Sequence, residues 1–242
     1  IGTPVPVTMD QEDLAHEFRH RDLTSAPIVD GDGRLLGVVT IDDIVDVIDE
    51  EHEDDLLRMG GVAEADLFED TWDTTKARFR WLFVNVGTAV MASAVIALFE
   101  ATLDQSVALA VLMPIVASMG GNAGTQTLPV AVRALAMRQL TRRNALRILA
   151  KEVTVGGING VLLAIIAGTL AALWFTDRVI GGVIAIAMVA TLVVAGFCGV
   201  AIPLALDRLN IDPAIASTVV LTTVTDVVGF FAFLGLAALF LL

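Results

Sequence analysis

The hydrophobic pattern divides the 242-residue chain into two regions. Beyond about residue 79, apolar residues dominate five long segments separated by short polar connections. Each segment is long enough for a helix that crosses a hydrocarbon core of about 30 Å, which needs about 20 residues. The pattern predicts a membrane domain of five transmembrane helices over 79–242, with spans at roughly 80–103, 106–137, 146–175, 180–206 and 213–242.

The N-terminal region has the pattern of a small α/β module. Three short apolar runs predict strands, and 30-DGDG-33 between the last two predicts a hairpin turn. Two longer stretches predict helices. A module this short buries little core, so we expect it to pair with another copy. The predicted strands are 5–8, 27–30 and 35–40, and the predicted helices are 10–20 and 41–57.

Charge separates the same two regions. Residues 1–78 hold 21 acidic and 6 basic residues, net −15, whereas residues 79–242 hold 7 and 9, net +2, and the two sum to −13. The apolar fraction of 56% and the mean hydropathy of +0.77 exceed those of ordinary soluble domains. The acidic region is a poor partner for nucleic acid and a suitable one for divalent cations. The single cysteine, Cys198, excludes a disulfide framework.

Basic residues mark one side of the predicted membrane domain, and Arg178 stands alone on the other. By the positive-inside rule we expect a multi-pass protein of the cell membrane, with its N-terminal module in the cytoplasm and its C-terminus outside. We also expect a natural N-terminal portion to precede Ile1. The basic residues on the crowded side are Lys76, Arg78, Arg80, Arg133, Arg138, Arg142, Arg143, Arg147, Lys151 and Arg208.

Asp226 is the only acidic residue deep inside the segment 213–242, which contains no Lys or Arg. Such a carboxylate is costly in a membrane and usually faces a bundle interior or a water-filled path. One interpretation is a carboxyl group hydrogen-bonded to another helix. The other is a cation site on a pore axis, where two copies of Asp226 from two chains would repel each other and favour a divalent ion.

Glycines and prolines interrupt the second apolar segment in 112-LMPIVASMGGNAGTQTLPVAVRAL-135. This pattern predicts a broken helix that lines a cavity, where freed carbonyls and amide oxygens are suitable partners for a cation. The alternative is tight helix packing through small residues. The interrupting residues are Pro114, Gly120, Gly121, Gly124 and Pro129, and the polar ones beside them include Asn122 and Gln126.

Predicted helix 41–57 carries nine acidic residues between positions 42 and 55, with no basic residue among them. Like charges at i,i+3 and i,i+4 repel each other, and oxygen-rich clusters suit Mg²⁺ or Ca²⁺ rather than zinc. The alternative is a solvated face. Asp212-Pro213 predicts a helix N-cap, and Asp212 would also lie within reach of the acidic helix at the cytoplasmic face.

Catalytic patterns are missing from the sequence, and we expect no enzyme. An intramembrane aspartyl protease needs acids on two spans, and only Asp226 qualifies, because Glu152 lies near a helix end. Phosphate-binding loops and nucleophile elbows do not occur. The three histidines, interpreted as surface residues, are His16, His20 and His52.

The motifs 113-MPIVASMGGNAGTQ-126 and 222-TTVTDVVG-229, with the five-span layout, resemble the MgtE family of magnesium channels and transporters. The likeness covers nearly the whole chain. The stretch 34-RLLGVVTIDDIVDVI-48 resembles the second half of a paired CBS module and its connection to the membrane. This resemblance divides the chain into a partial CBS module (1–48), an acidic connecting helix with its linker (41–78) and a pore domain (79–242).

The resemblance implies a homodimer with a pore between its subunits, and Mg²⁺ as both the transported and the regulatory ion. Asp226 would hold a largely hydrated Mg²⁺, and the acidic helix would plug the cytoplasmic mouth when Mg²⁺ is abundant. The implied pore lining is Asn122, Gly120, Gly121, Gly124, Gln126 and Thr223. The candidates for regulatory metal binding are Asp46, Asp49, Glu50, Glu53, Asp54 and Asp212.

Nucleotide binding is a weaker implication. A family CBS pair can hold ATP, and Thr40 and Asp43 match the usual ribose-contacting pattern. The family's acidic N-terminal domain and first CBS repeat are absent from these 242 residues, however, so half a pair is present.

The sequence therefore predicts an all-α polytopic membrane domain of five helices, preceded by a partial α/β CBS-type domain and an acidic connecting helix. The predicted function is Mg²⁺ uptake through a channel or transporter gated by cytosolic Mg²⁺. One alternative is a proton- or sodium-coupled secondary transporter of divalent cations, and another is a non-conducting metal sensor. The predicted partners are a second copy of the chain, membrane lipid and divalent cations, and not nucleic acid.

Overall fold

The computed structural model describes residues 4–61, 70–141 and 143–241. The chain forms two compact units, Ile1–Leu67 and Phe68–Leu242, each described by itself below.

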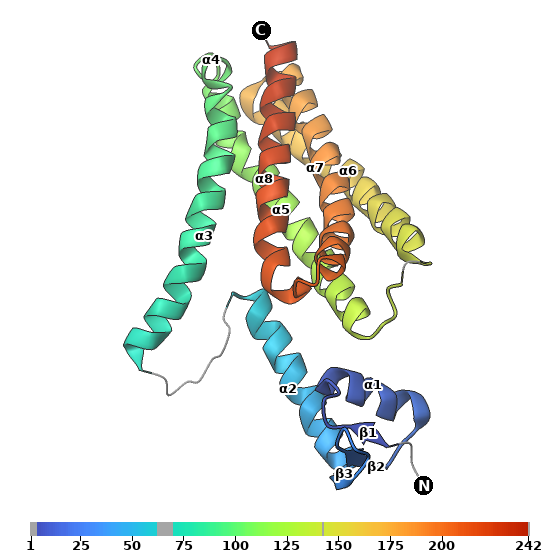
Figure 1. Ribbon diagram of the computed structural model, residues 1–242. Coiled ribbons are helices and arrows are strands. Elements are labelled where there is room, and N and C mark those ends of the chain that lie inside the picture. The colour runs from blue at the N-terminus through green and yellow to red at the C-terminus, as the bar shows by residue number, and fades with distance from the viewer. Residues whose placement is uncertain (1–3, 62–69, 142, 242) are drawn as a thin grey trace. The chain divides into compact units, whose positions relative to one another are not determined.

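The first unit is a three-stranded sheet with two helices (Figure 1). Strand β1 pairs in parallel with β2, and β2 pairs antiparallel with β3. The order strand, helix, strand, strand, helix is the predicted one, although β1 has only two residues. The elements are β1 Val5–Pro6, α1 Gln11–Arg21, β2 Ser25–Val29, β3 Leu35–Thr40 and α2 Ile41–Met59.

The predicted hairpin turn joins β2 to β3. Oδ1 of Asp30 accepts hydrogen bonds from the backbone N–H groups of Asp32 (2.9 Å) and Arg34 (2.8 Å). Gly33 has a φ of 77°, in the left-handed region that glycine adopts at little cost. An aspartate that folds back on its own backbone and a glycine in this region together explain why the sequence turns here.

The core of the first unit is small. Phe18 of α1, Ala26 of β2 and Ile44 of α2 are almost completely buried against one another. On β3, Leu35, Leu36 and Val38 remain exposed. The sheet thus leaves apolar side chains exposed, as expected of a module that buries little core.

The second unit is entirely helical in its described residues, and five of its helices are long and apolar enough to span a membrane (Figure 1). The fold-class prediction is therefore confirmed. The spans follow an up-and-down course, with the short helix α4 between the first two. The helices are α3 Thr71–Ala97, α4 Glu100–Leu103, α5 Val107–Ala136, α6 Ala145–Phe175, α7 Arg178–Arg208 and α8 Pro213–Phe240.

The first span differs from its predicted bounds of 80–103. Its helix begins at Thr71, because the side chain of Asp70 caps it by accepting a hydrogen bond of 3.2 Å from the backbone N–H of Trp72. It ends at Ala97, and residues 100–103 form α4 instead. An apolar pattern reports the part of a helix that lies in lipid, whereas the cap sets where the helix starts.

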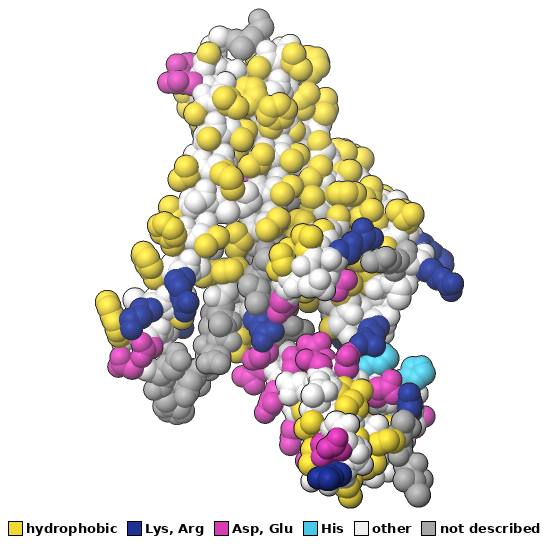
Figure 2. All heavy atoms as spheres, viewed as in Figure 1, with side chains coloured by type: hydrophobic (Ala, Val, Ile, Leu, Met, Phe, Trp, Pro, Cys, Tyr) yellow, Lys and Arg dark blue, Asp and Glu magenta, His cyan; other side chains and the backbone are white. Residues whose placement is uncertain are grey.

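Helix α7 is the centre of the membrane unit. In the most apolar 18-residue stretch of α7, 61% of the residues are buried, against 6% in the corresponding stretch of α3. Helices α5, α6 and α8 pack on α7, and α3 packs on α8. Hydrophobic side chains cover the visible flank of this unit, and basic side chains gather at the end where α3 and α6 begin (Figure 2).

The prediction of a broken second span is wrong. Helix α5 is continuous from Val107 to Ala136, with Pro114 and Pro129 inside it. A proline removes one backbone hydrogen bond from a helix, and the remaining bonds and the packing against α7 and α8 maintain the helix here. Of the glycines that suggested a break, Gly120 and Gly124 instead lie where α5 approaches its neighbours.

Candidate cation site in the membrane unit

Asp226 lies at the middle of α8. The helix runs from Pro213 to Phe240, so thirteen residues precede Asp226 and fourteen follow it. At 1.5 Å per residue, its Cα is about 20 Å from either end of the helix. The residue is half-buried, next to the completely buried Thr225.

Within the described part of the chain, no hydrogen bond or ion pair joins the Asp226 carboxyl group to another residue. The interpretation of Asp226 as a carboxyl group hydrogen-bonded to a neighbouring helix therefore finds no support within this chain. A carboxylate at this depth needs a compensating charge or proton. Asp226 therefore needs a compensating group beyond those that the described residues supply.

Helix α8 is held at this level by glycines of α5. A Cβ atom on Gly120 would lie 2.6 Å from Cγ2 of Thr191 and 3.3 Å from Cβ of Thr225, and one on Gly124 would lie 2.8 Å from Cδ2 of Leu221. Only residues without a side chain allow this approach. The packing interpretation is therefore correct for Gly120 and Gly124, both of which are buried.

These contacts define an antiparallel register between α5 and α8. Gly120 faces Thr225 and Gly124 faces Leu221, so Asn122 lies level with Thr223, within about one helical turn of Asp226. The structure thus brings the two motifs identified in the sequence to the same level of the bundle.

Threonine hydroxyl groups around Asp226 donate to their own helix. The Oγ1 atom of Thr223 donates to the carbonyl of Val219 (2.6 Å), and that of Thr225 donates to the carbonyl of Leu221 (3.1 Å). A hydroxyl group has one proton and two lone pairs. With its proton engaged, the partly exposed Thr223 hydroxyl presents an oxygen acceptor, which suits a cation and not an anion, whereas Thr225 is completely buried.

The polar side chains of α5 lie on a different face from its packing glycines. Ser118, Asn122, Thr125 and Gln126 are all exposed in the chain, and their spacing of four, three and one residues places them on one side of the helix. The side-chain N–H of Asn122 donates to Oγ of Ser118 (3.3 Å), which leaves the amide oxygen of Asn122 as an acceptor.

Pro129 adds a backbone acceptor to the same face. Because proline has no N–H, Pro129 cannot donate the helical hydrogen bond to the carbonyl of Thr125, four residues earlier. The helix therefore supplies an under-bonded carbonyl without being broken. Gly121 lies near this face, and a Cβ atom there would meet nothing within 4 Å.

Glu152, near the start of α6, is a carboxylate to which the sequence analysis assigned no role. Its side chain is only 17% exposed. Its Oε2 atom accepts a hydrogen bond of 3.2 Å from Oγ1 of Thr127 on α5, and its Oε1 atom lies 3.6 Å from Nζ of the exposed Lys151. The signal in the sequence was the one acidic residue of this helix, eight positions from its start and next to Lys151.

The acidic helix α2 belongs to the first unit. Asp46, Asp49, Glu50 and Glu53 are exposed, whereas Asp54 pairs with Arg58 (Oδ2 to Nη2, 3.2 Å). Within the described residues, no three His, Cys, Asp or Glu side chains form a group that could hold a metal. The four exposed acidic residues are spread along the helix, and the role of the predicted set in metal binding stays a prediction.

Thr40 and Asp43 cap the start of α2. Oδ2 of Asp43 accepts hydrogen bonds from the backbone N–H and from the hydroxyl of Thr40, both at 2.8 Å. These bonds hold the pKa of the Asp43 carboxyl below its usual value of 3.8. The two residues predicted to contact a nucleotide thus have a structural role, and their nucleotide contact stays a prediction.

The predicted N-cap at Asp212 is confirmed. Its Oδ1 atom accepts a hydrogen bond of 2.8 Å from the backbone N–H of Ala214, and Pro213 occupies the first turn of α8. Asp212 belongs to the membrane unit and α2 to the first unit. A shared metal site between them stays a prediction.

Comparison with known proteins agrees with the two-unit description. The family model MgtE, described as "Divalent cation transporter", matches residues 113–236. A CBS domain model matches residues 3–50. The first match includes Asp226 and the polar face of α5, and the second covers the sheet and the first half of α2.

Curated relatives extend the match over nearly the whole chain. Magnesium transporter MgtE of Enterococcus faecalis is 34% identical over 237 residues, which is 98% of this chain and 52% of the relative. The proteins of the same name from Thermus thermophilus and Bacillus subtilis are 34% and 32% identical, each over 96% of this chain and 52% of the relative. The chain spans about half the length of these relatives. Its membrane unit and its CBS segment together show that the chain belongs to the MgtE family of divalent cation transporters.

Proposed function

We propose that the protein mediates Mg²⁺ uptake across the cell membrane and that Asp226 is its central cation-binding residue. The observation that carries the proposal is a mid-helix carboxylate without a partner in the described chain, at a level where the Thr223 hydroxyl offers an acceptor. Support also comes from the relatives, which are named magnesium transporters.

Mg²⁺ suits such a site because it dehydrates reluctantly and usually keeps several waters. One carboxylate and a set of neutral oxygens cannot replace a full octahedral shell, but they can accept hydrogen bonds from its waters. Asp226 then supplies charge, while Thr223 and the amide oxygen of Asn122 contact the hydrated ion. Gly121 and Gln126 contribute to the lining, and Gly120 and Gly124 hold the helices at the required distance.

A homodimer would complete the pore. The polar face of α5, Ser118 to Gln126, is exposed in the single chain, and polar faces within a bilayer turn toward a bundle interior or a water-filled cavity. A second copy related by an axis along the membrane normal would place two Asp226 carboxylates across one path. Their mutual repulsion favours a divalent cation over a monovalent one.

Orientation follows from charge. The basic residues gather at the end of the membrane unit where α3 and α6 begin, and such an end faces the cytoplasm by the positive-inside rule. The CBS segment and α2 would then lie in the cytoplasm and the C-terminus outside. This arrangement exposes the acidic helix to cytosolic Mg²⁺.

Regulation would act through α2. At high cytosolic Mg²⁺, ions bound among Asp46, Asp49, Glu50, Glu53 and Asp212 screen their repulsion and favour a closed state. At low Mg²⁺ the acids repel and the path opens, which is feedback through a two-state element. Asp54 contributes less, because Arg58 already neutralises it. ATP at Thr40 and Asp43 would have to compete with their capping hydrogen bonds.

The test is Mg²⁺ flux into proteoliposomes that contain the chain. Asp226→Asn should abolish most of the flux, whereas Asp207→Asn should not, because Asp207 is an exposed acid at the end of α7. Equal flux through Asp226→Asn and the wild type would refute the central site. Collapsing the proton and sodium gradients with ionophores distinguishes the mechanisms, since a channel keeps its flux and a coupled transporter loses it.

A further inference from the structure

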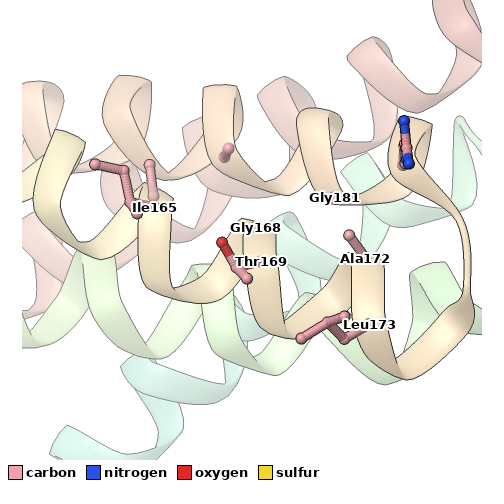
Figure 3. Close-up of a pocket in the computed structure, with 9 residues that line it drawn as sticks. Ile165, Gly168, Thr169, Ala172, Leu173 and Gly181 are labelled. Carbon is pink, nitrogen blue, oxygen red and sulfur yellow. The ribbon is translucent and has the colours of Figure 1, made fainter.

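Helices α6 and α7 leave a groove near the connection that joins them (Figure 3). Its volume is about 400 Å³. Ile165, Gly168, Thr169, Ala172 and Leu173 line it from α6, and Arg178 and Gly181 are among the residues that line it from α7. Both helices are long and apolar enough to span a membrane, so the groove opens on the flank of the membrane unit.

Small residues create the groove. A Cβ atom on Gly168 would lie 2.8 Å from the carbonyl oxygen of Gly181, and one on Gly181 would lie 2.6 Å from that of Gly168 and 2.7 Å from Cβ of Ala172. The two backbones therefore touch at this crossing. Because the side chains beside this contact are small, they leave a shallow groove on the surface where the two helices meet.

The surroundings of the groove are apolar. The exposed fractions of Ile165 and Leu173 are 62% and 75%, and both helices are long and apolar enough to span a membrane. A space of this size has more than ten times the volume of a water molecule, about 30 Å³. Water has few polar partners here, so hydrocarbon is the suitable occupant.

One end of the groove is cationic. Arg178 is exposed in the first turn of α7, and no acidic side chain pairs with it among the described residues. The adjacent Asp177 uses its Oδ1 atom to cap α7, accepting hydrogen bonds from the N–H groups of Val179 (2.7 Å) and Ile180 (3.4 Å). The guanidinium group is therefore available to an anion.

Trp174 marks the level of the membrane surface. It is 63% exposed at the end of α6, and its ring stacks on Phe175 with centroids 5.8 Å apart. Tryptophan is enriched at the boundary between lipid headgroups and hydrocarbon. Arg178 thus lies at headgroup level, where guanidinium groups bind phosphate through paired hydrogen bonds.

We propose that this groove binds a phospholipid of the adjacent leaflet, with its phosphodiester on Arg178 and one acyl chain in the groove along the contact of α6 with α7. The charge of Arg178 complements the headgroup, and the apolar groove that leads away from it complements the chain. A bound lipid would stabilise the contact of α6 with α7, because a ligand that binds only the folded state shifts the unfolding equilibrium.

Native mass spectrometry of the full chain, titrated with phosphatidylglycerol in detergent, tests this proposal. Arg178→Gln should reduce retained lipid about five-fold, the contribution expected of one basic residue near a membrane surface. Thr169→Phe should also reduce it, because the larger side chain enters the groove. The matched controls are Arg208→Gln, at the other end of α7, and Leu170→Phe, an exposed neighbour that does not line the groove; both should retain lipid.

Thermal unfolding gives an independent readout. Phosphatidylglycerol should raise the Tm of the wild type and of the two controls more than that of Arg178→Gln, and inorganic phosphate should not reproduce the effect. The proposal is overturned if Arg178→Gln and Thr169→Phe retain lipid like the wild type. It is equally overturned if the controls lose lipid to the same extent, or if inorganic phosphate alone gives the full stabilisation.

Discussion

Thr127 of α5 donates a 3.2 Å hydrogen bond to the carboxylate of Glu152 on α6, which is only 17% exposed. Helix α6 packs mainly on α7, so this bond is a polar link between α6 and the helix that carries the polar face. It also gives a structural role to the one acidic residue of α6.

Breaking this link should destabilise the membrane unit. Hydrogen bonds between membrane helices contribute about 0.6 kcal/mol on average and up to about 1.7 kcal/mol. Because the acceptor is charged, we expect Thr127→Val to cost about 1 kcal/mol in unfolding free energy. Unfolding in mixed micelles measures the cost. In a double-mutant cycle with Glu152→Ala, strictly additive effects would contradict the link.

Adding one methyl group to Gly120 should disturb the packing around Asp226. The new Cβ atom would lie 2.6 Å from Cγ2 of the buried Thr191, whose hydroxyl group is bonded to the carbonyl of Ala187. We expect Gly120→Ala to cost about 1–3 kcal/mol, as overpacking does, and to lower Mg²⁺ flux. For the unfolding free energy Gly121→Ala is the matched control, since its Cβ atom would meet nothing within 4 Å. Equal stabilities of the two variants would contradict this account of the packing.

Neutralising the exposed acids of α2 should alter the response to internal Mg²⁺. The triple variant Asp49→Asn, Glu50→Gln and Glu53→Gln removes like charges that repel at helical spacing. If α2 senses Mg²⁺, flux into proteoliposomes should then depend less on the Mg²⁺ concentration on the cytoplasmic side. A charge-matched control neutralises Asp13, Glu17 and Asp32 of the same unit. Unchanged inhibition in the α2 variant would exclude α2 as the sensor.

Acidification should weaken the start of α2. The folded-state pKa of Asp43 lies below its usual value of 3.8 because Thr40 donates two hydrogen bonds to it. Its stabilising contribution is therefore complete above the ordinary pKa and is lost as the pH falls through the folded pKa. Hydrogen exchange of the first turn of α2 should be faster in Asp43→Asn than in the wild type at pH 7. The difference should shrink below pH 3.8, and a pH-independent difference would contradict the assignment.

Features set by nearby residues could be predicted from the sequence. The turn at Asp30 and Gly33, the cap at Asp212 and the five apolar spans each depend on a few neighbours along the chain. The continuity of α5 could not be predicted, because glycine and proline indicate only a local tendency to break a helix. Contacts of Gly120 and Gly124 with α7 and α8 decide the outcome. Predicting the Thr127–Glu152 hydrogen bond would likewise require knowledge of which spans are neighbours.

The proline in α5 has a consequence for mutagenesis of the polar face. Replacing Asn122, Thr125 or Gln126 by alanine removes a side-chain oxygen but leaves the Thr125 carbonyl where it is. Among substitutions of α5, the one that returns an N–H to this carbonyl is the replacement of Pro129. Alanine variants of the polar residues would therefore report only on side-chain oxygens. The backbone oxygen of Thr125 would show itself through Pro129→Ala, as a large effect on flux at a residue without a polar side chain.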